Sequence, residues 1–502
     1  MAKRAHIPVS VLVLGDQLDP AHPALARAQP SQTRVVMIES EALLSGRRWH
    51  KQRLHLVLSA MRHYAQGLRA QGFEVDYLRA KSFRAGLAEH RKRFDPARVQ
   101  CAEPMSHGLR RALPKLGVTL VRHDRFMCHY REFGEWAKRQ RVLRMDAFYR
   151  MRRQATGYLM EGSKPIGGAF SFDSENREPA ARAPERWPDA LRDDLDAIDE
   201  EVLRELPPLA FGAAPDGTWA TTRAAALRRL KHFIEQVLPG FGPYQDVMLH
   251  RSWHMSHSML SAYLNLGLLH PREVCDAIVA AYESGGVPLA SAEGCLRQIL
   301  GWREYIWGTY WLFGPEYGSS NSLNAQRALL PLYTDPSRTR MQCMKDALHS
   351  IDEHAYAHHI QRLMVLGNLS LLAGVQPLEL ARYMQVSFID GGEWVMWPNV
   401  IGMALYADGG KMSTKPYAGG GAYIHRMSDA CQRCSYRPTE RTGEHACPFT
   451  TLYWSFFARH RDRFVDHPRV RNMIRGLDRL KDRRETLEHA EQILRGLSEG
   501  TV

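Results

Sequence analysis

The sequence predicts an α/β N-terminal domain built on a doubly wound parallel sheet, followed by a large all-helical C-terminal domain. Two observations support this prediction. In about the first 125 residues, short runs rich in β-branched side chains alternate with amphipathic helical stretches, which is typical of a parallel sheet with helices on both faces. From about residue 221 onward, long helical periodicity replaces that alternation.

Five short apolar runs are the predicted strands, at residues 9–14, 35–38, 75–78, 99–102 and 118–121. Between the second and third runs, apolar residues from Leu54 to Leu68 recur at three- and four-residue spacing, which predicts one face of a helix. Ligands of parallel sheets bind at the carboxyl ends of the strands. The turn after the first strand is therefore a candidate binding site, although a purely structural turn is equally consistent with its residues, Gly15, Asp16 and Gln17.

Prolines and glycines interrupt the chain from about residue 160 to 220, which predicts loops and short elements. We therefore expect three parts. Residues 1–135 form the α/β domain, residues 136–220 form an interdomain linker with a helix and Pro/Gly-rich loops, and residues 221–502 form the helical domain. Within the last part, the spacing of apolar residues predicts helices at 224–237, 290–311, 355–372 and 453–464.

The composition narrows the class of protein. Lys and Arg number 67 against 54 Asp and Glu, a net charge of +13, and 44% of the residues are apolar. These values exclude wholesale disorder and a membrane-embedded body, and they fit a nucleic-acid partner, an acidic membrane surface or simple solubility. No stretch approaches the roughly 20 apolar residues of a membrane helix. The apolar run 9–14 is too short for a signal-peptide core, so we expect a cytoplasmic protein.

Four of the eight cysteines form a candidate metal site. Cys431 and Cys434 are separated by two residues, Cys447 follows after twelve intervening residues and precedes a proline, and Cys343 lies upstream. A tight turn brings two thiolates of such a pair to one metal centre. Structural zinc and a four-cysteine iron-sulfur cluster both fit this set, and the Cys-Pro step favours iron. The other four cysteines stand alone, which is typical of buried small side chains.

Histidines form a second cluster. Residues 353–362 are predicted to be helical, which places His354 and His358 four apart on one face. The glutamate that a zinc protease needs after the first histidine is absent. A histidine in a pocket can instead act as a proton donor near neutral pH, although histidines with ordinary packing roles remain the simpler alternative.

Several motifs together resemble the photolyase and cryptochrome family. Residues 301–305 (GWREY), with Arg297 and Gln298 before them, and the serine-rich residues 256–264 are similar to its flavin-domain signature, and residues 358–362 (HHIQR) resemble the H-H-x-x-R of (6-4) photolyases. Further similar segments are residues 59–63, 398–403 and 414–418. With the four cysteines, the whole chain resembles the bacterial branch of iron-sulfur cryptochromes and photolyases.

The resemblance implies FAD in the helical domain, with Ser258 and Ser261 at the pyrophosphate and Arg362 paired with Asp390 beside the flavin ring. It also implies a [4Fe-4S] cluster with a structural role. The implied FAD-binding residues are His257, Ser258, Leu260, Ser261, Gln298, Arg303, Arg362, Asp390, Met396 and Asn399, and the implied cluster ligands are Cys343, Cys431, Cys434 and Cys447.

The function that the resemblance implies is light-driven repair of (6-4) photoproducts in UV-damaged DNA by a monomer with no membrane partner. His358 or His359 would donate a proton to the lesion and Tyr417 would line the lesion pocket. Tyr383 would carry electrons toward the flavin. A ribityl lumazine antenna (6,7-dimethyl-8-ribityllumazine) is implied for the N-terminal domain, with Gly15, Asp16, Gln17 and Glu39 as its candidate contacts.

Some positions depart from this branch. Met396 stands where the family places Asn or Glu near the flavin N5, and methionine cannot donate a hydrogen bond. Tyr383 and Met384 stand where the branch carries Trp and Tyr, and Leu43 and Gly46 stand at the antenna site. These departures favour the alternative of a blue-light photoreceptor that keeps FAD and cluster without repair. A zinc-bearing nucleic-acid-binding protein is the remaining alternative.

Overall fold

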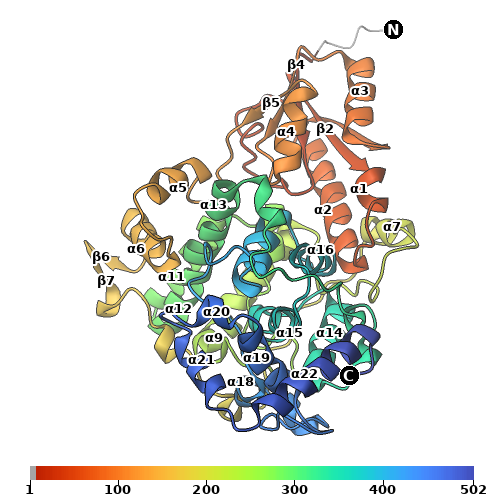
Figure 1. Ribbon diagram of the computed structural model, residues 1–502. Helices are drawn as coiled ribbons and strands as arrows, with labels where there is room; N and C mark the ends of the chain where they lie inside the picture. Colours follow the sequence, from red (N-terminus) through yellow and green to blue (C-terminus); the bar gives the residue numbers. More distant parts are fainter. Residues whose placement is uncertain (1–6) are drawn as a thin grey trace.

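The computed structural model describes residues 7–502 and shows a sheet domain joined to a larger helical body (Figure 1). The sheet has five parallel strands in the order β3-β2-β1-β4-β5. Every residue of β2 is buried, as expected of a parallel strand covered on both faces. All five strands predicted from the sequence are confirmed: β1 (Val9–Val13), β2 (Thr33–Ser40), β3 (Glu74–Ala80), β4 (Arg98–Ala102) and β5 (Val118–Val121).

Alternate residues of each strand face two different helix layers. Val11 and Val35 pack with Leu56 of α2 (Lys51–Ala70). Leu12 and its neighbours pack on the opposite face with Leu87 of α3 (Phe83–Phe94) and with α4 (His107–Lys115). A short α1 (Glu41–Ser45) follows β2. Because α2 and α3 cover opposite faces, the sheet is doubly wound as predicted.

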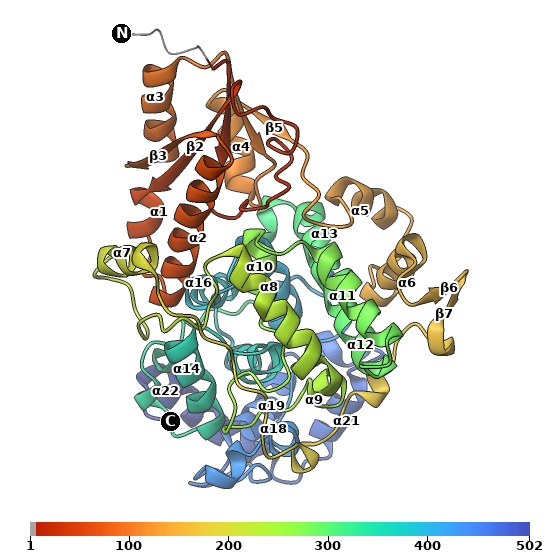
Figure 2. The same ribbon diagram turned by 180° about the vertical axis from the view of Figure 1, so that it is seen from behind.

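The segment after the sheet packs against both the helical body and the sheet domain. Two helices, α5 (Tyr130–Ala137) and α6 (Met145–Thr156), pack against the helical body, where Phe133 and Phe148 contact Tyr305. A small hairpin, β6 (Met160–Glu161) with β7 (Lys164–Pro165), and an extended stretch follow. The chain then returns to the sheet domain as α7 (Ala197–Glu205), which lies beside α2 in Figures 1 and 2.

The helical body surrounds the candidate site. Its helices are α8 (Arg223–His232), α9 (Phe241–Tyr244), α10 (Ser261–Leu266), α11 (Pro271–Glu283), α12 (Leu289–Leu296), α13 (Glu304–Phe313), α14 (Gln342–His354), α15 (Asn368–Ala373), α16 (Pro377–Ser387), α17 (Glu393–Met396), α18 (Gly421–Met427), α19 (Pro448–Arg459), α20 (Arg461–Phe464), α21 (Arg471–Asp478) and α22 (Arg483–Glu499). Four π-helical segments join or extend them, at Phe233–Val237, Arg297–Arg303, Gln361–Gly367 and Trp397–Ala404. Such segments are frequent at functional sites.

One predicted helix is wrong at its start. The sequence predicts a helix over 355–372, with His354 and His358 on one face, but α14 ends at His354 and Ala355 adopts the left-handed conformation with φ 52°. Residues 356–358 are not helical. The two histidines therefore lie on different elements, and their four-residue spacing does not indicate a metal site.

Within residues 7–502, the structure contains no helix that combines the length and the apolar character needed to cross a bilayer.

Candidate active site

A cavity of about 420 Å³ lies in the helical body. Elements far apart in the sequence line it, including the serine-rich loop before α10, the π-helical segments and the chain after α16. It is lined by all ten residues assigned to FAD and by all three assigned to catalysis: His257, Ser258, Leu260, Ser261, Gln298, Arg303, Arg362, Asp390, Met396 and Asn399, with His358, His359 and Tyr417. The structure thus gathers the predicted flavin and lesion residues in one place.

An ion pair anchors the inner part of the cavity. Arg362 Nη1 lies 2.9 Å from Asp390 Oδ1, and the Ser261 hydroxyl donates to Asp390 Oδ2 at 2.8 Å. Burial raises the pKa of Asp390, but Arg362 and Ser261 outweigh this effect and lower the pKa below its usual value. The guanidinium also donates to the Ala357 carbonyl and stacks on the Phe388 ring, so its position is fixed.

The serine-rich loop is held in an unusual conformation. Met255 and Met259 have φ values of 45° and 56°, a region that non-glycine residues adopt at a cost. The loop presents Ser258 to the cavity, whereas the Ser261 hydroxyl is already committed to Asp390. The two serines expected at the pyrophosphate therefore differ in role. Ser258 is available to a ligand, whereas Ser261 orients the Asp390 carboxylate.

The histidine pair stands in two contrasting environments. The His358 ring is buried and stacks on His257 at a centroid distance of 4.4 Å. Burial, followed by the neighbouring charges of His257 and His359, lowers the pKa of His358 well below its usual value. The His359 side chain is 49% exposed, and its Nε2 lies 3.3 Å from Asp246 Oδ1. Near neutral pH, His358 is consequently neutral, and only His359 has a carboxylate partner for a positively charged ring.

Buried polar atoms without partners point to a missing polar ligand. Both ring nitrogens of His358, the Arg303 Nε and the Ser256 hydroxyl are buried and make no hydrogen bond within the described residues. Such groups cost free energy unless something else satisfies them. His358 and Arg303 belong to the cavity lining. A polar group bound in the cavity would supply the missing partners, which fits the isoalloxazine and phosphate oxygens of a flavin.

Comparison with known proteins identifies the family. The chain is 42% identical to a (6-4) photolyase of Agrobacterium fabrum over 480 residues, which covers 92% of this chain and 93% of that protein. The chain belongs to the bacterial photolyase-related family. A family model described as deoxyribodipyrimidine photo-lyase-related protein also matches residues 11–213 of this member.

Solved structures share the fold of this photolyase-related chain. A bacterial class III photolyase from Agrobacterium tumefaciens aligns with a TM-score of 0.58 at 15% identity, over 92% of this chain and 98% of that one. A cryptochrome from Synechocystis sp. PCC6803 aligns with a TM-score of 0.53 at 14% identity, over 79% of this chain and 83% of that one. At these identities the likeness concerns the fold, and it agrees with the predicted sheet domain and helical domain.

The four cysteines that the family pattern selects lie together. Cys343, Cys431, Cys434 and Cys447 line one small space. Cys343 is in the first turn of α14 and Cys447 precedes α19, so two helix N-termini face the site. Burial, followed by the charges of the other three sulfurs, raises the pKa of Cys343. Four thiols that line one small space cannot all ionise without a cationic group between them.

The predicted antenna residues have protein partners. Gly15 permits close packing, because a Cβ there would lie 2.9 Å from the Met61 sulfur. The Gln17 amide donates to the Ala102 carbonyl. Glu39 accepts from Arg62 at 3.0 Å and from the Tyr77 hydroxyl at 2.6 Å.

The turn after β1 contacts the helical body directly, because the Leu18 N–H donates to the Leu266 carbonyl. Asp16 keeps one buried carboxylate oxygen without a partner, and burial raises its pKa. These contacts hold the two bodies together, and the binding of a lumazine there stays a prediction.

Tyr383 lies outside the cavity lining, where it packs edge-on to Tyr333 at 5.0 Å between ring centroids. Its neighbour Met384 lines the cavity instead. Sequence reasoning missed Tyr356, which lines the cavity and lies 5.4 Å from the Trp253 ring. It also missed Asp246, the partner of His359. No local motif marks either residue, since each acts through a contact between distant segments.

Proposed function

We propose that this protein is a light-driven DNA lyase that repairs pyrimidine (6-4) photoproducts. The observation that carries the proposal is the single cavity that joins the Arg362–Asp390 pair to the adjacent histidines. The relative from Agrobacterium fabrum that is named a (6-4) photolyase, 42% identical over nearly the whole length, supports the same activity.

FAD is the proposed cofactor, held in the cavity with Arg362 and Asp390 beside the ring and Ser258 near the phosphates. When bound in its reduced form and excited by blue light, FAD supplies one electron to the lesion. The protein orients the charged groups beside the ring. Asp390 is fixed by Arg362 and Ser261, so its charge cannot move away from a ring placed beside it. Met396, buried at the same cavity, offers that ring no hydrogen bond.

His359 is the proposed proton donor. Its ring lies at the accessible side of the cavity, and a carboxylate 3.3 Å from Nε2 stabilises a positively charged ring. An oxygen of the lesion that gains negative charge takes up this proton. His358 is neutral near pH 7 because its pKa is lowered, so it is suited to hydrogen bonding and to packing against His257.

DNA would approach the accessible side of the cavity. Tyr417 lines the cavity, and Lys415 Nζ lies 5.9 Å from its ring centroid. Arg469 and Arg177 also lie close enough to affect the pKa of Tyr417, which burial raises. Cationic side chains beside an opening suit the phosphates of DNA, and a flipped nucleotide would pack on the tyrosine.

The four cysteines are proposed to hold one [4Fe-4S] cluster. The donor set is sulfur only, the sulfurs converge, and all eight cysteines are free of disulfides. These features fit a four-thiolate cluster. The cluster would join α14, α19 and the segment between α18 and α19, so its proposed role is structural. For the lumazine, the candidate residues already bond to protein, and we derive no light-harvesting step from them.

The test of the function uses protein reduced chemically before illumination. Blue light should convert an oligonucleotide that carries one (6-4) photoproduct back to intact pyrimidines, and the dark control should not change. An oligonucleotide with a cyclobutane dimer tests lesion specificity. Binding of the damaged DNA without repair would instead identify a photoreceptor. Reduction before illumination is essential, because Met396 is expected to impair reduction of the flavin by light more directly than repair itself.

The Arg362→Ala variant is expected to lose most of its flavin. Removal of the guanidinium leaves Asp390 buried and unpaired, which costs about 3–5 kcal/mol. The measurement is flavin absorbance per polypeptide together with the melting temperature. The control is the double variant Arg362→Ala/Asp390→Ala, which removes both charges and should recover stability but not flavin. Full flavin occupancy in Arg362→Ala protein would contradict this placement of the ring.

A further inference from the structure

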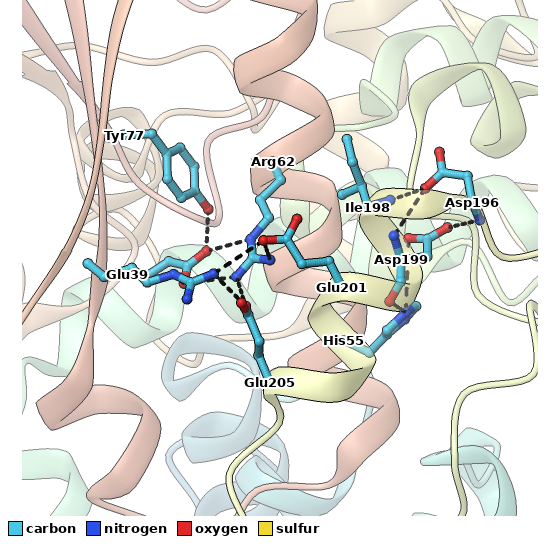
Figure 3. A network of polar contacts seen from close by, with 10 residues as sticks. Glu39, His55, Arg62, Tyr77, Asp196, Ile198, Asp199, Glu201 and Glu205 are labelled. Carbon is cyan, nitrogen blue, oxygen red and sulfur yellow. Dashed lines mark hydrogen bonds and ion pairs between the residues drawn. The ribbon is translucent and has the colours of Figure 1, made fainter.

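A second polar cluster lies outside the cavity lining, where the linker helix α7 packs on α2. We call it the α2–α7 cluster, and its members are His55, Ser59, His63, Asp196 and Asp199. The first three recur every four residues and so share one face of α2. The two aspartates lie at the start of α7, and Figure 3 shows Asp199 beside His55.

The arginines of the neighbouring network in Figure 3 already pair with glutamates. Arg62 binds Glu39 at 3.0 Å and Glu205 at 2.6 Å, and Arg79 binds the same two glutamates. Glu201 lies 3.5 Å from Arg62. No cation of that network is free to neutralise Asp196 or Asp199. Apart from the imidazoles of the α2–α7 cluster, no cationic side chain of residues 7–502 forms an ion pair with these two carboxylates.

Each aspartate uses one carboxylate oxygen to cap α7 and leaves the other for something else. Asp196 Oδ1 accepts from the N–H groups of Ile198 and Asp199, at 2.9 and 3.0 Å. Asp199 Oδ2 accepts from the Asp196 N–H at 3.4 Å and from the Thr221 hydroxyl at 3.3 Å. The remaining oxygens, Asp196 Oδ2 and Asp199 Oδ1, both face His63.

The side chains opposite these oxygens are buried and lack partners. The His63 side chain is 10% exposed, and its Nε2 makes no hydrogen bond. The Ser59 hydroxyl, one turn away on α2 and fully buried, also has none, and neither does Asp199 Oδ1. His55 fixes the backbone of α7 instead, because its Nε2 lies 3.1 Å from the Asp199 carbonyl. Three atoms that can ligate a metal, His63 Nε2, Asp196 Oδ2 and Asp199 Oδ1, thus lie together.

The spacing of the free atoms fits a metal ion better than a hydrogen bond. His63 Nε2 lies 3.5 Å from Asp196 Oδ2 and 3.5 Å from Asp199 Oδ1, and all three atoms lie within 4.8 Å of one another. N–H···O bonds measure about 2.7–3.2 Å, so neither contact is a good one. A tetrahedral zinc ion with bonds of about 2.1 Å separates its ligands by about 3.4 Å.

We propose that the α2–α7 cluster binds a first-row transition-metal dication, with zinc as the best fit. The ligands are His63 Nε2, Asp196 Oδ2 and Asp199 Oδ1, with water or the Ser59 hydroxyl in the fourth position. One imidazole nitrogen with two carboxylate oxygens is a donor set that zinc accepts. The Asp196 side chain is 55% exposed, so a hydrated ion can enter from solvent. The bound ion fastens the linker to the sheet domain.

The experiment measures zinc binding to holoprotein that carries its full iron content, so that the cysteines are not free to take zinc. Equilibrium dialysis against zinc alone should load one ion per chain. Asp196→Asn should weaken binding at least about tenfold, as should His63→Gln. Asparagine still caps a helix, so Asp196→Asn protein should fold. Zinc should also slow tryptic cleavage after Arg192, an exposed residue shortly before α7.

The matched control is Glu200→Gln, which removes one negative charge from the exposed side of α7 and should bind zinc as the parent does. Equal zinc binding by parent, Asp196→Asn and His63→Gln protein would overturn the proposal, because the zinc would then bind at another site. Displacement of zinc by an equal concentration of magnesium would overturn it as well, since an imidazole ligand disfavours magnesium. Both results are independent of DNA repair.

Discussion

Cys434→Ala protein is expected to lose its iron and several-fold of its soluble yield. Cys434 is only partly buried, and its sulfur makes a 3.8 Å contact with the Arg340 carbonyl. Truncation of such a side chain by itself lowers the free energy of unfolding only slightly. Loss of the cluster, in contrast, removes the group that joins α14, α19 and the segment between α18 and α19. A metal that binds only the folded chain contributes directly to its stability.

The control for this variant is Cys275→Ala. Cys275 is buried in α11 near Cys295 and does not line the space shared by the four cluster cysteines, so its truncation leaves a small cavity and an intact cluster. The measurements are iron content and visible absorption after anaerobic purification, and the melting temperature. A parent protein with stoichiometric zinc and no iron would contradict the cluster, and so would a Cys434→Ala protein with unchanged iron.

The sheet was predictable because its signal is local. Each strand is a short run that is often rich in β-branched residues, and α2 shows the spacing of one buried helix face. The cavity residues were found by resemblance. Ser258, Arg362 and Asp390 come from three distant segments, and no periodicity predicts that their side chains meet. Only the motifs of a known family placed them at one site before the structure did.

The failures have physical causes. A left-handed Ala355 ends α14, and no glycine or proline marks that break, so the spacing of His354 and His358 suggested one helix. Asp246 and the α2–α7 cluster depend on tertiary contacts across more than 100 residues. The resemblance named His63 within a matched segment, but its neighbours Asp196 and Asp199 lie in the linker, where the sequence indicated only loops and an unplaced helix.

The two cavity histidines should respond very differently to substitution. His359 pairs with Asp246, whereas His358 is buried and stacked on His257. Burial and the neighbouring His257 and His359 lower the pKa of His358 well below 6.5, so its ring is neutral at pH 7 and gains a proton only as the pH falls toward that lowered value. A proton donor of this kind would make repair faster in acid. His359, which is exposed and lies 3.3 Å from the Asp246 carboxylate, is not subject to this burial.

His359→Asn is therefore expected to slow repair by about 10² to 10⁴ fold in reduced, illuminated protein at pH 7, the range that loss of an acid catalyst produces. Flavin content and binding of damaged DNA should remain, because the side chain lies at the accessible side of the cavity. The matched change His358→Asn should slow repair less and leave the shape of its pH profile intact. Single-turnover rates between pH 5.5 and 8.5 measure both. If repair by the parent rises steeply toward acid and His358→Asn abolishes that rise, His358 is the donor, and the contact between His359 and Asp246 serves only to position the ring.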